Sequence, residues 1–214
     1  MILKKIKLNK KGLVPLEDKR HLMGFTLIET LISFVVFVIL LGIVLANYRS
    51  AEKNFTLERA AYAFAQNIKR AEIMALSSKK FKKLVSPFEE VTPKGYGIFV
   101  SSKPLNNDFY TLFADIINGD CYLNVPFVQE TVQKIYLEKG VKIKSIESSV
   151  SLNFCDNYPC ITFCFEPPDP KVFFKKSSSL EVDTNEIQII ISLIEDPTKT
   201  KTIRLNKTGA VSVE

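Results

Sequence analysis

Histidine is nearly absent from this chain, because the one histidine, His21, lies within the first 24 residues. Residues 25–214 therefore offer no imidazole for a Ser-His-Asp triad, a Cys-His pair or a zinc enzyme. Glycine is also scarce, with 8 residues among 214, and no P-loop, dinucleotide fingerprint or kinase signature is present. These absences favour a protein that is not an enzyme and needs no cofactor.

Positive charge is concentrated at the start of the chain. The formal net charge is +6, but residues 1–24 hold seven basic residues against Glu17 and Asp18. Residues 25–214 carry 22 basic and 21 acidic residues and are close to neutral. The charge balance of this larger part does not imply a general attraction to DNA.

A long apolar segment follows the basic leader. The 13 residues 34–46 contain no charged or strongly polar side chain. As a helix, residues 25–46 would cross about 30 Å of hydrocarbon. The positive-inside rule then places residues 1–24 in the cytoplasm and the chain after Arg49 on the exported side. An ordinary signal anchor, or a signal peptide cut near Val44 and Ala46, would show a similar pattern.

Glu29 distinguishes this segment from an ordinary signal sequence. An ionisable group inside a membrane span costs about 2.5–3.5 kcal/mol at the bilayer centre and is by default a functional feature. The apolar segment is also longer than the hydrophobic part of a usual signal peptide. Both features favour a membrane helix in which Glu29 has a specific partner.

The residues around Glu29 form a recognisable motif. Gly24-Phe25-Thr26-Leu27-Ile28-Glu29, between a basic leader and a long apolar helix, resembles the class III signal of type IV pilins and type II secretion pseudopilins. The resemblance implies that prepilin peptidase cuts between Gly24 and Phe25 and methylates the new amino group of Phe25. It also implies that Glu29, with Thr26 beside it in the motif, acts in assembly, its carboxylate meeting the N-terminal ammonium of a neighbouring subunit.

The same resemblance implies a set of partners and a location. The partners are prepilin peptidase, other pilin or pseudopilin subunits, an inner-membrane assembly platform and membrane lipid. The protein would be a single-pass inner-membrane protein with a cytoplasmic N-terminus and a periplasmic or extracellular C-terminal domain, later incorporated into a filament. An unrelated single-span, membrane-anchored exported protein is an alternative.

The pattern becomes amphipathic after residue 47. One helical stripe consists of Leu57, Ala61, Phe64, Ile68, Ala71 and Ala75. It predicts a continuous helix over about residues 25–78, with two helices broken near Asn47 as the alternative. The expected domains are a leader (1–24), a membrane and assembly helix (25–48), its amphipathic half (49–80) and an exported β-rich domain (81–214).

Short β-type segments between turn residues fill the last part of the chain. The expected strands are 96–101, 109–114, 132–137, 141–146, 151–155, 160–166, 186–194, 200–205 and 210–213. Gly140, in a three-residue turn, is expected to have a positive φ and to join 132–137 and 141–146 as a hairpin. The predicted fold class is α+β, a long N-terminal helix packed on an antiparallel β-sheet domain.

The β-rich part resembles one branch of the family. The segments 95–98, 112–119, 137–143 and 203–209 are similar to strands and turns of H-type pseudopilins and T-type minor pilins (GspH/FimT-like). The stretch 167–183 has no counterpart in that comparison. The resemblance implies a pilin-like fold with a long helix on antiparallel hairpins.

All four cysteines, Cys121, Cys155, Cys160 and Cys164, lie in the part expected to be exported. Their spacing lacks the paired C-x-x-C pattern of structural zinc sites, so no metal is expected. Disulfides suit an oxidising compartment, and of the three connectivities the most local bond is Cys155–Cys160, which leaves Cys121–Cys164. Four free buried thiols are the alternative.

A second basic cluster lies near the C-terminus and consists of Lys199, Lys201, Arg204 and Lys207. Phosphate binding would need several of these side chains on one face, so a DNA-binding minor pilin for DNA uptake is an alternative function. Lysines on an exposed hairpin also protect a sheet edge, which needs no ligand. A third alternative, an anchored hydrolase that uses only carboxylates, would require two acidic residues in a cleft.

Overall fold

The computed structural model describes residues 25–82, 89–116, 121, 123, 130–150, 152–155, 158–168, 171–177 and 180–214. It contains two compact units, Met1–Ala46 and Asn47–Glu214, each described here on its own. The predicted leader, including Gly24, lies outside the described residues, as do Asn118 and Gly119 of a predicted turn.

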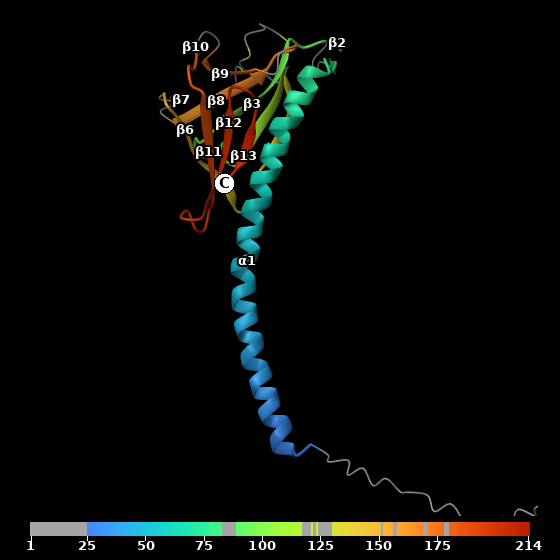
Figure 1. Ribbon diagram of the computed structural model, residues 1–214, viewed down its shortest axis with the longest axis vertical. Coiled ribbons are helices and arrows are strands. Elements are labelled where there is room, and N and C mark those ends of the chain that lie inside the picture. Colours follow the sequence, from blue (N-terminus) through green and yellow to red (C-terminus); the bar gives the residue numbers. More distant parts are fainter. Residues whose placement is uncertain are drawn as a thin grey trace, which may run out of the picture. The chain divides into compact units, whose positions relative to one another are not determined.

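One helix, α1 (Leu27–Leu76), covers both the apolar and the amphipathic segments of the sequence. In the second unit, every residue of the predicted stripe is buried: Leu57, Ala61, Phe64, Ile68, Ala71 and Ala75. Ala60 and Met74 are buried beside them. Small residues on this stripe allow the helix to approach the strands closely, and Figure 1 shows this part of α1 lying along the β-rich region.

Among the described residues, thirteen strands follow α1, and every pair of neighbouring strands is antiparallel. They are β1 (Phe81–Lys82), β2 (Glu90–Val91), β3 (Gly95–Ser101), β4 (Phe109–Asp115), β5 (Thr131–Tyr136), β6 (Val141–Ser148), β7 (Asn153–Cys155), β8 (Tyr158–Phe165), β9 (Val172–Ser177), β10 (Leu180–Glu181), β11 (Glu186–Leu193), β12 (Thr200–Asn206) and β13 (Val211–Val213).

Two sheets make up most of the second unit (Figure 1). The larger has the order β10-β9-β8-β3-β4-β5, with β7 also paired to β8. The smaller has the order β13-β12-β11-β6, and β1 pairs with β2. The predicted α+β class, with antiparallel strands after a long helix, is confirmed.

The main core contains side chains from the α1 stripe and from both sheets. The period of two is clear in β11, where Ile187, Ile189 and Ile191 are fully buried. A smaller cluster contains Phe113, Cys164, Cys121 and Leu123. At Gly97, a Cβ atom would lie 2.5 Å from the carbonyl oxygen of Phe163 and 2.6 Å from the Phe113 ring, so glycine is required for this packing.

Polar contacts fix the second half of α1 to the sheets. Asn67 Nδ2 donates to Tyr110 Oη at 2.8 Å, and the Tyr110 ring packs edge-on against Phe64. Arg59 binds Glu138 through two hydrogen bonds, and Lys53 pairs with Glu195. These contacts join the helix to β4 and to the loops after β5 and β11.

One predicted hairpin is wrong. Gly140 has the expected positive φ of 92°, but β5 pairs with β4 and β6 pairs with β11. The turn therefore leads the chain from one sheet to the other, because each strand pairs where its apolar face is buried. Four strands were not predicted: β1, β2 and β10 have two residues each, and β9 lies within the unassigned stretch 167–183.

Candidate assembly site

The motif residues Thr26 and Glu29 lie at the start of α1. The Thr26 carbonyl accepts hydrogen bonds from the amides of Glu29 (3.0 Å) and Thr30 (3.2 Å), and Thr26 Oγ1 accepts from the Glu29 amide at 3.3 Å. Thr26 is therefore the N-cap residue of α1, and Glu29 occupies the third helical position, the spacing of a capping box. A carboxylate in the first turn also complements the helix dipole.

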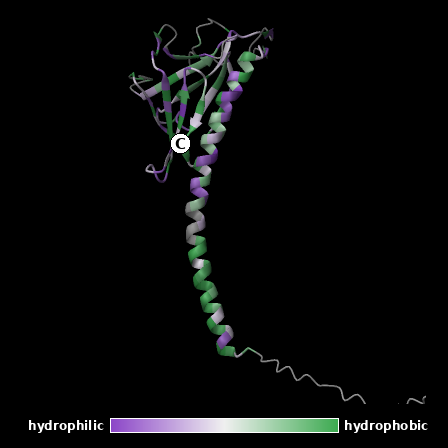
Figure 2. Ribbon diagram, viewed as in Figure 1, coloured by the Kyte–Doolittle hydropathy of each residue, from purple (hydrophilic) through white to green (hydrophobic). Residues whose placement is uncertain are grey.

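The segment that follows is apolar and exposed. Residues Leu27–Leu45 are long and apolar enough to cross a membrane, and none of this segment is buried in the structure. Figure 2 shows it as almost uniformly hydrophobic, in contrast with the mixed colours of the second unit. A surface of this kind is stable in lipid or against other apolar helices and not in water.

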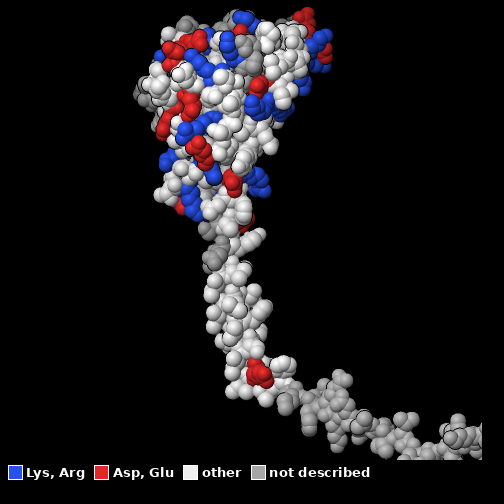
Figure 3. All heavy atoms as spheres, in the orientation of Figure 1, with Lys and Arg blue, Asp and Glu red and all other residues white. Residues whose placement is uncertain are grey.

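Glu29 carries the only charge of that segment. Figure 3 shows one acidic group on a surface that is otherwise free of charge. No basic side chain among the described residues forms an ion pair with Glu29. Phe25, directly before the N-cap, is 78% exposed. The structure thus brings together Phe25, Thr26 and Glu29, and it leaves the carboxylate available to a partner.

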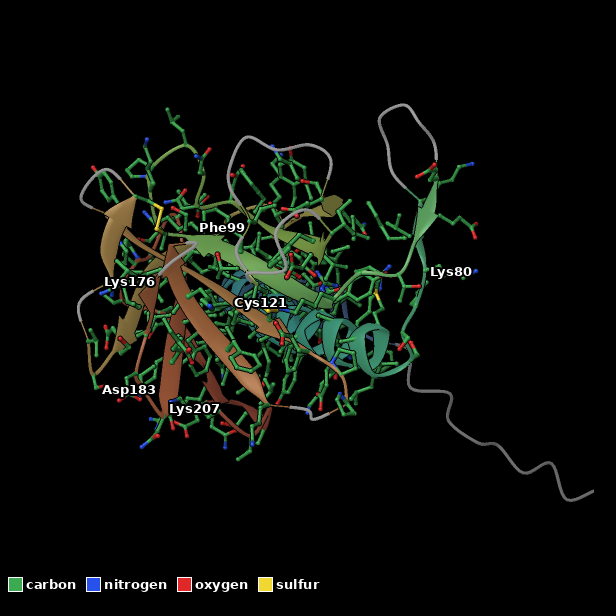
Figure 4. The ribbon with its side chains drawn as sticks, turned by 90° about the horizontal axis from the view of Figure 1, so that it is seen from above. Lys80, Phe99, Cys121, Lys176, Asp183 and Lys207 are labelled. Carbon is green, nitrogen blue, oxygen red and sulfur yellow. A yellow bond between two sulfur atoms is a disulfide. The ribbon has the colours of Figure 1, made fainter. Side chains whose placement is uncertain are left out.

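The four cysteines form two disulfides, Cys121–Cys164 and Cys155–Cys160. Cys121 and Cys164 are buried, and Cys121 is labelled in Figure 4. A carboxylate oxygen of Glu166 lies 3.2 Å from Cys121 Sγ, so these three residues meet as a group of metal-binding type. Because the two sulfurs are bonded to each other, neither is a thiolate, and the group does not offer the ligands of a soft-metal site.

The second basic cluster is interspersed with acids. Arg204 lies 2.9 Å from Glu214 and 3.6 Å from Glu186, and Lys207 lies 3.0 Å from Asp183, a pair labelled in Figure 4. On β12, Lys201 and Arg204 are an odd number of residues apart and so belong to opposite faces of the strand. The four basic residues therefore do not form one continuous positive face for a phosphate backbone.

No protein-family model matches this chain, and no curated protein matches it significantly. A solved structure that is similar to it is the minor pseudopilin EpsH from the type 2 secretion system of Vibrio cholerae. The two are 11% identical, the match covers 74% of this chain and 95% of that chain, and the TM-score is 0.33.

The sequence did not reveal the ion pairs of Lys53 and Arg59, which lie on α1 in the second unit. The Lys53 ammonium donates to Glu195 and lowers the pKa of that carboxyl, while the hydrogen bond to Glu138 raises the pKa of Arg59. The partners are 142 and 79 residues apart in sequence. No local pattern could have paired them, because they meet only once both sheets are in place.

Proposed function

We propose that this chain is a structural subunit, a minor pilin or pseudopilin, of a type IV pilus or a type II secretion pseudopilus. The observation that carries this proposal is the carboxylate of Glu29, unpaired among the described residues, at the start of an entirely exposed apolar helix. A soluble helix would not expose this surface, and the cost of a charge within a membrane span favours a specific partner for Glu29 beyond its place in the helix cap.

Assembly gives this carboxylate a partner. Cleavage after Gly24 by prepilin peptidase would create an ammonium group at Phe25, which the peptidase then methylates. When one subunit docks beside another, that ammonium and the Glu29 carboxylate of the neighbour neutralise each other in a medium of low dielectric constant. A buried pair of this kind fixes the register of neighbouring helices even where its net stabilisation is small.

The proposed location follows from the same residues. The leader remains in the cytoplasm, residues Leu27–Leu45 cross the inner membrane, and the β-rich unit is exported. Two disulfides in that unit are consistent with an oxidising compartment. The chain then leaves the membrane for a filament with the help of an assembly platform.

Processing is tested by the N-terminal residue and the mass of the protein extracted from membranes of its own host. The expected product begins at N-methylated Phe25, and a Gly24→Leu variant should retain its leader because a bulky side chain blocks access to the scissile bond. A mature chain that begins at Asn47, or one that keeps residues 1–24, would contradict the proposal.

Assembly is tested separately with Glu29→Gln, which removes the charge and keeps the length of the side chain. We expect normal cleavage and membrane insertion, with the amount in sheared filaments reduced at least roughly tenfold because the ammonium of the neighbour loses its partner. Glu58→Gln is the matched control, since Glu58 lies on the same helix within the second unit. Equal incorporation of both variants would remove Glu29 from assembly.

A further inference from the structure

A groove runs between α1 and β13 in the second unit. It has a volume of about 430 Å³. Its lining includes Tyr62, Ala65, Ile73 and Met74 of α1 and Val211 of β13. Figure 1 shows β13 beside α1, and Lys69 Nζ of α1 donates at 2.8 Å to the carbonyl of Gly209, in the turn before β13. We call this feature the α1–β13 groove.

The strand that borders the groove has a free edge. β13 is the last strand of the smaller sheet, and in the described part of the chain it pairs only with β12. Glu214 and Thr202 exchange both of their backbone hydrogen bonds, and the Asn206 amide donates to the Ala210 carbonyl. In an antiparallel ladder the residues between these positions, Val211 and Val213, direct their N–H and C=O groups away from β12. Among the described residues, these groups have no hydrogen-bond partner.

The side chains of the groove combine apolar surface with positive charge. Ile73 is 65% exposed and Tyr62 is 52% exposed, although both lie on a helix whose opposite stripe is buried. Lys69 is paired with Glu72, whereas the neutral side chain of Gln133 is the only described acceptor for the side chain of Arg70. Lys79 forms no ion pair with a described residue. Within the described structure, two cations thus lack an acidic partner beside exposed apolar groups.

We propose that the α1–β13 groove binds an extended segment of a partner protein, which pairs with β13 and adds a fifth strand to the smaller sheet. The free N–H and C=O groups of Val211 and Val213 supply the main-chain hydrogen bonds. Every second side chain of the segment faces α1. Among these, apolar side chains cover Ile73 and Tyr62, and carboxylates meet Arg70 and Lys79.

A helix in the same groove would leave the edge of β13 unpaired, because a helix bonds its own backbone groups internally. An extended segment satisfies these groups and matches the charge of the groove. This inference goes beyond the proposed structural role, and it concerns residues outside the processing motif. The proposed binding at the α1–β13 groove depends only on the second unit and not on assembly into a filament.

Binding is tested with the full chain in detergent micelles and three synthetic peptides, each labelled with a fluorophore. The first has ten residues, with threonine at every second position and valine and glutamate in turn at the positions between, so that both face the groove. In the second, lysine replaces glutamate, and the third repeats the first with a central proline. Fluorescence anisotropy should show saturable binding of the first peptide, with affinity at least roughly tenfold above that of the other two. Amide exchange at Val211 and Val213 should slow when it binds.

Matched variants test the hydrogen bonds of the β13 edge and the basic side chains of the groove separately. Val213→Pro removes an outward N–H, and we expect at least roughly tenfold weaker binding; Glu214→Pro removes an inward N–H and should bind like the natural chain. Reversal of Arg70 and Lys79 to glutamate should shift the preference to the valine–lysine peptide, whereas Lys144→Glu on β6 should not.

Two results would overturn the inference. One is the absence of binding by the valine–glutamate peptide at millimolar concentration; the other is equal binding by the Val213→Pro and Glu214→Pro variants. Tighter binding of a helical leucine–glutamate peptide would also overturn it, because the groove would then accept a helix. None of these measurements depends on cleavage after Gly24, so the two proposals fail separately.

Discussion

Tyr110 connects the helix to the sheet, and its ionisation makes the stability of the fold depend on pH. Its side chain is buried between α1 and β4, and this burial raises the pKa of its phenol to about 12. In an unfolded chain the value is about 10, so folding favours the neutral phenol. Its contribution to stability is complete below about pH 10 and is lost as the pH rises from about 10 to about 12.

We therefore expect Tyr110 to ionise about two pH units above the ordinary value for tyrosine. A shift of this size corresponds to about 3 kcal/mol between the two protonation states. The ultraviolet absorbance of tyrosinate should show a late component that disappears in Tyr110→Phe. A late component that survives in Tyr110→Phe would assign the shift to another residue, such as the buried Tyr96.

Residues with a local signature were predicted, and those with long-range partners were not. Glu29 stands out in sequence because a charge interrupts an apolar run, and Gly140 because a turn needs positive φ. The bond between Asn67 and Tyr110 joins residues 43 positions apart. Neither residue type predicts this hydrogen bond from sequence, because asparagine and tyrosine are also common on exposed surfaces.

At the level of elements, the two disulfides should differ in their effect on stability. Cys121–Cys164 closes a loop with a separation of 43 residues, and Cys155–Cys160 closes one of 5 residues. Loop-closure entropy gives about 4 kcal/mol for the first bond and about 2 kcal/mol for the second. Urea denaturation of the two double Cys→Ala variants should show the larger loss for Cys121/Cys164. A larger loss for Cys155/Cys160 would contradict this reasoning.

The elements themselves followed the apolar pattern, but their pairing did not always do so. The buried stripe of α1 and nine of the strands lie close to their predicted positions. The hairpin through Gly140 was wrong because a short turn is equally suited to a hairpin and to a crossing between sheets. β9 was missed although Val172 and Phe174 alternate inward, because prolines and serines surround it.

At the scale of the whole molecule, the core and the apolar helix segment are separate. Every residue of the main core lies at Leu57 or beyond, and none comes from Leu27–Leu45.

We therefore expect residues 47–214, exported to an oxidising compartment, to form a soluble monomer with both disulfides and a cooperative unfolding transition, whereas the full chain requires detergent. A fragment that starts at Tyr62 is the matched control. It lacks the core residues Leu57, Ala60 and Ala61 and the Arg59–Glu138 ion pair, and the loss of the Leu57 side chain alone costs about 2–5 kcal/mol, so it should be markedly less stable. Aggregation of residues 47–214, with exposed apolar surface detected by dye binding, would mean that the apolar segment completes the core and does not serve as an anchor.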